Sequence, residues 1–176
     1  MDQMSERRLA QVHPALAVRV RLAAAQLMLA GIEIRVVQGL RTAAEQDALY
    51  AKGRTVIERD AKGKPLPTVT DAPGGYSDHN FGLAVDTVPG VPGRPSWTPD
   101  WRVSSAGFKA MVVEMKRQGL LWAGDWVHRK GDYDHFYLPG SPTTPTDAMR
   151  ADLAQGGLAQ VFRNCDAGKY AAEVAV

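Results

Sequence analysis

The fold of this chain is decided around residues 77–86, which read SDHNFGLAVD. Residues 83–88 predict a short β-strand, and Gly82 allows the chain to enter that strand through a tight turn. Side chains alternate along a strand, so Asp86 points to one face while His79 reaches over from the preceding turn. An imidazole and a carboxylate are thereby directed toward one place.

A second polar stretch, residues 132–135, reads DYDH and opens another expected strand at 135–138. Neighbouring strands lie about 4.8 Å apart, so His135 would join His79 and Asp86 around one ion if these strands are neighbours. Nitrogen and oxygen ligands without sulfur suit zinc, which keeps an open position for water in catalytic sites. Asp132 would then act as the general base on that water and pass the proton to the leaving amine.

Each of these residues also has a plainer interpretation. A histidine is more often a polar residue of the surface or core than a ligand, and Asp86 at a strand end is typical of a cap or turn. Asp132 and Asp134 lie in a polar loop, where solvated carboxylates are the ordinary case. The spacing of the residues alone leaves both interpretations open.

The composition indicates one globular domain with enough length for a real core. The chain has 176 residues, of which 45% are hydrophobic and 23% charged. A net charge of +2 with dispersed basic residues argues against nucleic-acid binding. The single cysteine, Cys165, excludes an internal disulfide and a cysteine-based zinc knuckle. We expect a monomer, because nothing in the sequence demands more.

The sequence also gives an expectation about membranes and location. It contains no run of about eighteen apolar residues, so no membrane span is expected. Residues 1–8 are polar and charged, and no secretory signal is seen. We therefore expect a cytoplasmic protein.

Alternation and capping signals predict an α+β fold: a small, mostly antiparallel sheet flanked by helices, with a single zinc site in a cleft. Thr42 and Glu45 form a capping box that opens one helix. Residues 53–76 predict a long loop with a hairpin across 55–70. The other expected elements are helices at 14–30, 43–52, 105–118 and, as two short pieces, 147–164, and strands at 32–36, 83–88, 120–126 and 135–138.

The Pro- and Gly-rich residues 139–145 predict a break in the chain. We assign residues 1–140 to the catalytic domain. Residues 141–176 are expected to form a helical appendage that packs on the same domain.

Three separated motifs resemble one family of zinc peptidases. Residues 77–86 fit Ser-x-His-x-x-Gly-x-Ala-x-Asp, residues 124–126 (GDW) precede Asp132-x-x-His135-Phe136, and residues 39–42 read GLRT. The family includes the vancomycin-resistance D,D-carboxypeptidases and D,D-dipeptidases. It also includes the L-alanyl-D-glutamate endopeptidases of phage endolysins and bacterial wall hydrolases. The resemblance covers roughly residues 10–140.

The resemblance implies one zinc ion held by His79, Asp86 and His135, with Asp132 as the catalytic acid and base. Carboxypeptidase members usually carry glutamate where Asp132 stands, whereas some phage endopeptidases carry aspartate. Arg41 corresponds to an arginine near the site in such enzymes. A guanidinium there would bind a substrate carboxylate or the oxyanion. The alternative is a surface arginine beside a helix cap.

Four further residues are assigned around the site. Ser77 either hydrogen-bonds substrate or braces the turn, and Trp126 and Tyr133 are candidates for lining the cleft, so all three enter the candidate substrate-binding set. His128 is expected to be a solvent-exposed loop residue, and it is a substitute base together with Asp134 if Asp132 is not the base.

The family resemblance points to a zinc metallopeptidase that cuts peptidoglycan stem peptides, between L-Ala and D-Glu, as a phage-type endolysin. One alternative is a D,D-carboxypeptidase of the same family. The other alternative is a non-catalytic cell-wall-binding module that retains the fold. Purified stem peptides and metal analysis separate these possibilities.

Overall fold

The computed structural model describes residues 1–127, 131–142 and 144–171. Its centre is a four-stranded antiparallel sheet with strand order β1-β2-β4-β3. The predicted α+β class with a small antiparallel sheet is therefore confirmed. The strands are β1 (Ile34–Gln38), β2 (Ala84–Pro89), β3 (Leu121–Trp122) and β4 (His135–Tyr137).

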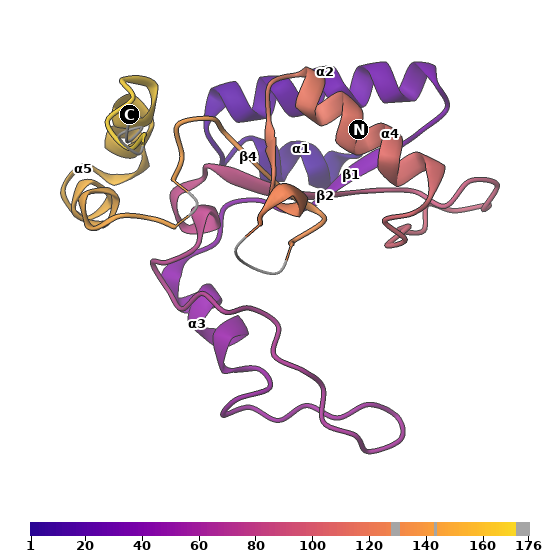
Figure 1. The fold of residues 1–176 in the computed structure, drawn as a ribbon, viewed down its shortest axis with the longest axis horizontal. Helices are drawn as coiled ribbons and strands as arrows, with labels where there is room; N and C mark the ends of the chain where they lie inside the picture. The colour runs from indigo at the N-terminus through magenta and orange to yellow at the C-terminus, as the bar shows by residue number, and fades with distance from the viewer. Residues whose placement is uncertain (128–130, 143, 172–176) are drawn as a thin grey trace.

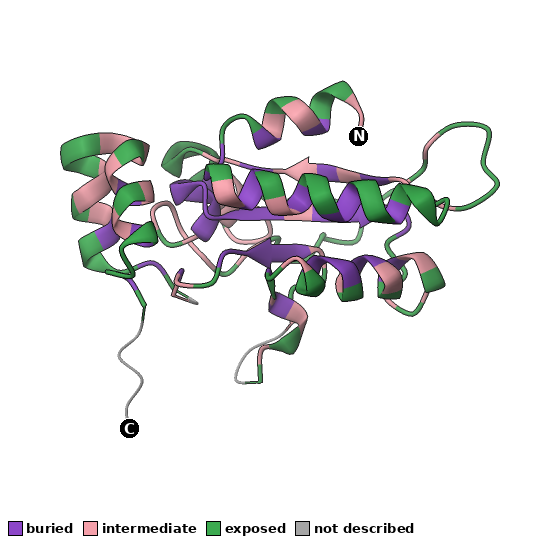
Figure 2. Ribbon diagram, turned by 90° about the horizontal axis from the view of Figure 1, so that it is seen from above, coloured by how far each residue is buried: buried purple, intermediate pink, exposed green. Residues whose placement is uncertain are grey.

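Two long helices, α2 (Pro14–Leu29) and α4 (Ala106–Arg117), lie side by side and pack against the sheet (Figure 1). The His13 side chain accepts a hydrogen bond from the amide of Ala15 and so caps α2 at its first turn. The helices turn their buried residues toward the strands (Figure 2). The fully buried core between the layers includes Leu16, Val20, Val36, Val85, Met111, Met115 and Phe136.

A short helix that the sequence did not reveal, α1 (Gln3–Leu9), lies along the outer edge of β1. Ser5 Oγ accepts a hydrogen bond from the amide of Val36 at 3.0 Å, and the Arg8 guanidinium donates to the carbonyl of Val36 at 2.7 Å. These contacts satisfy backbone groups that an edge strand otherwise leaves open. The outer edge of β1 is therefore covered by helix.

The helix α3 (Ala43–Ala51) and the chain that follows it project away from the sheet (Figure 1). We call residues 52–74 the arm. An antiparallel bridge joins Arg59 and Pro65 near the tip of the arm, within the predicted hairpin. The Arg54 guanidinium donates to the carbonyl of Thr70 at 2.8 Å and so ties the outgoing limb to the returning limb. The capping box of Thr42 and Glu45 opens α3 as predicted.

The last helix, α5 (Asp147–Asp166), is bent at Gly157, which agrees with the two short helices predicted there. Met149, Val161 and Cys165 of α5 belong to the same buried core as the sheet. Phe162 lies against Gly82, whose φ of +65° is available to glycine at little cost. The domain boundary at 140/141 stays a prediction.

Two predicted boundaries are wrong. Residues 120–126 were expected to be strand, but only Leu121–Trp122 pairs, and Ala123–Asp125 forms a 3-10 turn. The first strand runs from Ile34 rather than from residue 32, because Ile32 still belongs to the turn that ends α2. No described helix is both long and apolar enough to cross a membrane.

Candidate metal centre

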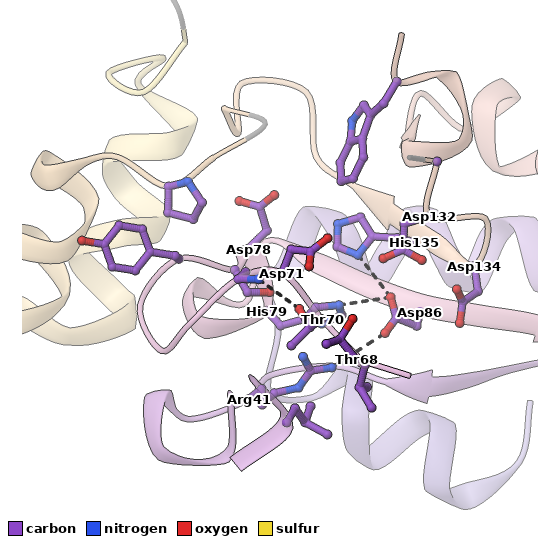
Figure 3. A pocket seen from close by; sticks show the side chains of 18 residues that line it. Arg41, Thr68, Thr70, Asp71, Asp78, His79, Asp86, Asp132, Asp134 and His135 are labelled. Atoms are coloured by element: carbon purple, nitrogen blue, oxygen red, sulfur yellow. Dashed lines mark hydrogen bonds and ion pairs between the residues drawn. The ribbon is translucent and has the colours of Figure 1, made fainter. Parts of the chain in front are cut away.

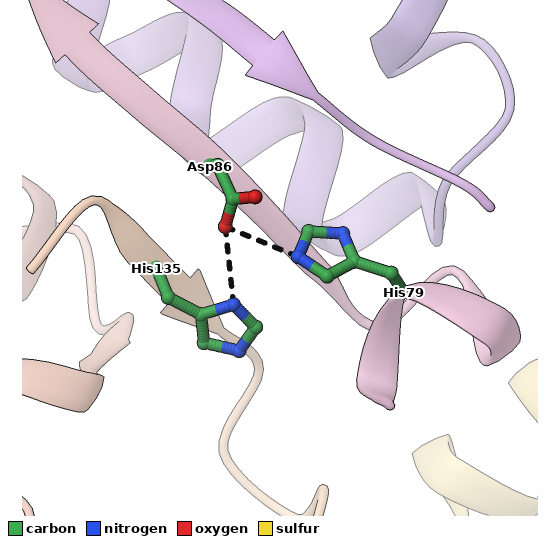
Figure 4. A group of neighbouring side chains, drawn as sticks. All are labelled: His79, Asp86 and His135. Carbon is green, nitrogen blue, oxygen red and sulfur yellow. Dashed lines mark hydrogen bonds and ion pairs between the residues drawn. The ribbon is translucent and has the colours of Figure 1, made fainter. Parts of the chain in front are cut away.

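The structure brings His79, Asp86 and His135 together, with one ligand atom from each within 4.8 Å of the others (Figure 4). Asp86 on β2 pairs directly with His135 on β4 in the sheet register. His79 comes from η1 (Asp78–Phe81), the 3-10 turn just before β2. The two strands and this turn therefore place three donor groups at one end of the sheet.

The donor geometry fits a zinc ion. Asp86 Oδ1 lies 3.1 Å from His79 Nε2 and 3.1 Å from His135 Nδ1. Bonds of 2.0–2.2 Å in a tetrahedral zinc site put neighbouring donors about 3.4 Å apart, which is close to both distances from Asp86. The set has two nitrogens and one oxygen, which is a ligand set that zinc accepts and that leaves a fourth position.

The His79 ring is oriented by a backbone carbonyl. Its Nδ1 lies 2.8 Å from the carbonyl oxygen of Gly39, and the ring is buried. A proton on Nδ1 that is donated to this carbonyl leaves the lone pair of Nε2 facing Asp86. In the described part of the chain, His135 Nε2 has no hydrogen-bond partner although it is buried.

We call His79, Asp86 and His135 the triad. The histidine charges stabilise the ionised Asp86, and the Asp86 charge stabilises protonated His135. Burial disfavours the ionised form of Asp86, but the charges and hydrogen bonds of His79 and His135 outweigh it and hold the pKa of Asp86 well below its usual range. Burial also opposes protonation of His135, yet the hydrogen bond and charge of Asp86 raise the pKa of His135 above its usual value. A divalent cation would take over the role that the imidazole charges have here.

The triad opens into a cleft of about 540 Å³ (Figure 3). This volume lies within the range of about 300–1,000 Å³ that is usual for ligand sites. The returning limb of the arm, residues 68–72, forms part of its lining. The remaining lining residues are Arg41, Leu49, Tyr76, Ser77, Asp78, Trp126, Gly131, Asp132, Asp134 and Pro145.

Asp132 is exposed and lines the cleft, and its charge acts on both Arg41 and His135. Figure 3 shows its carboxylate close to His135, with Asp134 beside it. Burial, the negative charges of Asp86 and Asp132, and a hydrogen bond to Asp132 raise the pKa of Asp134 to about 8. Asp134 therefore shares a hydrogen bond with Asp132 next to the candidate ligands.

Arg41 is nearly buried, with 11% of its side chain exposed, and its Nη2 lies 3.8 Å from Asp86 Oδ2. Its Nη1 donates to Gln46 Oε1 at 2.6 Å. Burial lowers the pKa of Arg41, whereas Asp86, Glu45 and Asp132 act in the opposite direction. A guanidinium retains its charge under such conditions, so Arg41 supplies a fixed cation beside the triad.

The other assigned residues divide between two hollows. Ser77 and Trp126 line the cleft, and Trp126 Nε1 donates to Tyr137 Oη at 3.1 Å. Tyr133 does not line the cleft; it lines a smaller adjoining hollow together with Asp132 and Asp134. His128 lies outside the described residues.

Two buried polar residues that the sequence analysis did not single out hold the surrounding segments. Asn80 donates to the carbonyl of Arg41 at 2.9 Å and accepts from the amide of Gly75 at 2.9 Å. Gln46 accepts from Arg41 and donates to the carbonyl of Ala72 at 2.7 Å. The one sequence signal was the position of Asn80 directly after His79.

The fold and the site together define an α+β domain with a histidine–aspartate–histidine group at one end of its sheet that could hold a metal ion. Residues 70–138 match the model of an M15 peptidase family that is described as D-alanyl-D-alanine carboxypeptidase. These residues of the chain are therefore similar to that peptidase family. The resemblance predicted from the three motifs is confirmed.

Two characterised proteins are similar to the chain. One is the peptidoglycan L-alanyl-D-glutamate endopeptidase CwlK of Bacillus subtilis (strain 168), which is 37% identical over 112 residues, or 61% of this chain. The aligned region spans 62% of that relative's length. The other is the L-Ala D-Glu endopeptidase ChiX of Serratia marcescens, whose crystal structure matches with a TM-score of 0.53 at 26% identity, covering 79% of this chain and 89% of that one.

Proposed function

We propose that this protein is a zinc metallopeptidase that cleaves peptidoglycan stem peptides between L-Ala and D-Glu. One zinc ion per chain would be held by His79, Asp86 and His135. The observation that carries the proposal is the convergence of these three donors at one point of the cleft. The names of both relatives support the choice of bond, because each is an endopeptidase for L-Ala–D-Glu.

A zinc ion in this site would supply a Lewis acid and lower the pKa of a water molecule to about 7. Asp132, which lines the cleft, would accept the proton of the attacking water and return it to the leaving amine. The Asp134 carboxyl hydrogen-bonds with Asp132 and would orient it. Arg41 contributes positive charge where the carbonyl oxygen becomes negative, or it binds a carboxylate of the stem.

Digestion of purified peptidoglycan, with mass spectrometry of the products with and without a chelator, tests this proposal. We expect free peptides that begin with D-Glu, glycan strands that keep L-Ala, and no products after chelation. Stems shortened only by the terminal D-Ala would reject the endopeptidase assignment. Intact stems together with substoichiometric zinc would indicate a non-catalytic wall-binding module.

A D,D-carboxypeptidase is the second candidate, because the matching family model carries that description. The two relatives, both named as L-Ala–D-Glu endopeptidases, favour the endopeptidase over this candidate.

We further propose that the protein acts as a monomer, and that it is held in the cytoplasm before release to the wall, as in phage endolysins. The resemblance to the endolysin branch supports this setting. Cell fractionation before and after lysis, with light scattering of the purified protein, tests both points. Wall-bound protein in intact cells would contradict the storage step.

A further inference from the structure

We propose that Tyr76 and Pro145, which lies just before α5, form one wall of the cleft and that Arg150 of α5 is a positioning residue for this wall. In this arrangement Tyr76 and Pro145 contact a part of the stem peptide remote from the cleaved bond. The inference rests on the proposed function and extends it to substrate length. Residues 70–138 alone would contain Tyr76 but would lack Pro145 and Arg150.

Arg150 connects α5 to the turn that precedes the metal centre. Its Nη1 donates to the carbonyl of Pro145 at 2.9 Å and to the carbonyl of Gly75 at 3.3 Å. Its guanidinium lies over the ring of Tyr76, 4.2 Å from the ring centroid. Asp147 pairs with the same guanidinium, so most of its donors are used by the protein itself.

The turn at Gly75 is held from both sides. Arg150 binds its carbonyl, while Asn80, next to the candidate ligand His79, binds its amide at 2.9 Å. Ser141 adds another tie by donating to Asp78 Oδ1 at 2.9 Å. The chain after β4 therefore fixes the entrance of η1 and the cleft residues beside it.

Tyr76 and Pro145 both line the cleft, and Tyr76 remains 45% exposed. In Figure 3 the C-terminal helix lies at the opposite end of the cleft from Asp132. A tyrosine ring stacked on a guanidinium is a rigid surface with an apolar body and a polar tip. Because Asp147 neutralises Arg150, this wall binds by contact area rather than by charge.

The test compares two substrates: a disaccharide–tetrapeptide fragment and a blocked N-acetyl-L-Ala–D-Glu amide. Arg150→Ala and Tyr76→Ala should raise KM for the long substrate about five- to tenfold, with kcat changed less than about twofold. For the short substrate, KM should change less than about twofold, because the wall lies beyond its reach. Tyr76→Phe keeps the ring and should retain the wild-type KM.

Arg163→Ala is the matched control, since Arg163 is exposed on the same helix and does not line the cleft. Hydrogen exchange without substrate gives a separate readout: Arg150→Ala should speed exchange of the Gly75 amide several-fold, and zinc content should not change. An equal KM penalty for both substrates, or unchanged exchange at Gly75, would overturn the proposal. If wild-type protein cleaves neither substrate, the proposed function fails. Hydrogen exchange at Gly75 still tests whether Arg150 holds this turn in place.

Discussion

The two sides of the cleft are built differently. The ligand side stands on β2, β4 and η1, and its imidazoles are almost fully buried. The opposite lining comes from the arm, from the loop around Asp132 and from the start of α5, and it includes exposed residues such as Val69 and Tyr76. Hydrogen-bonded strands fix distances between atoms more tightly than loops do.

This contrast separates two tasks. Metal ligands tolerate little displacement, and the direct pairing of Asp86 with His135 meets that demand. A substrate wall has to fit one polymer and can differ between relatives without loss of the metal centre. We therefore expect substitutions on the ligand side to remove the metal, and those on the loop side to leave the metal in place while lowering rate or affinity.

The largest effect is expected for His135→Ala. Removing one of three ligands should leave the protein without stoichiometric zinc and lower kcat/KM by more than about 10³-fold. Metal analysis of protein purified without chelator gives the content. Tyr137→Phe on the same strand is the control, since it changes only the hydroxyl next to Trp126. Full zinc content in His135→Ala would remove this residue from the ligand set.

The next largest effect is expected on the loop side of the cleft. Asp132→Asn should keep zinc but lower kcat by about 10²–10⁴-fold, because the amide cannot accept the proton. Asp125→Asn is the control, an exposed carboxylate paired with Lys116 outside the cleft. Turnover that survives in Asp132→Asn would place the base elsewhere, with Asp134 the first residue to substitute.

Arg41→Lys should cost about 10–100-fold in kcat/KM although the charge is retained. A lysine cannot reach Gln46 and the substrate oxygen with one planar group. Steady-state kinetics measure the loss, with Arg59→Lys at the exposed tip of the arm as the control. Wild-type kinetics in Arg41→Lys would leave Arg41 with a purely structural role.

The smallest effect concerns stability. Val85→Ala, in the buried face of β2, should lower the free energy of unfolding by about 2 kcal/mol. Val69→Ala, in the exposed cleft wall, should lower it by less than about 0.5 kcal/mol. Urea unfolding of both variants measures the difference. Equal losses would mean that the arm belongs to the cooperative core, against the contrast drawn above.

The sequence was informative wherever a local pattern sets the structure. The apolar spacing of α2, the capping box at Thr42 and the strand entry at Gly82 are all local, and all were predicted. The candidate triad was also accessible, because the alternation of β2 directs Asp86 to one face and the motif names its partners.

The parts that were missed depend on contacts between distant segments. Helix α1 has no strong pattern of its own, and its place follows from hydrogen bonds with Val36. Asn80, Gln46 and Arg150 act by joining loops that lie far apart in the chain. Tyr133 was predicted to line the cleft, yet it lines the adjoining hollow.

The helix that covers β1 also bears on how copies of the protein meet one another. At the other edge of the sheet, β3 contains only Leu121 and Trp122. A strand of a neighbouring chain cannot pair with β1, because α1 covers that edge, and β3 at the other edge is too short to template fibre growth. Deleting residues 1–9 would expose the edge of β1, and the truncated protein should aggregate, measured as turbidity, at concentrations where the intact chain stays dispersed.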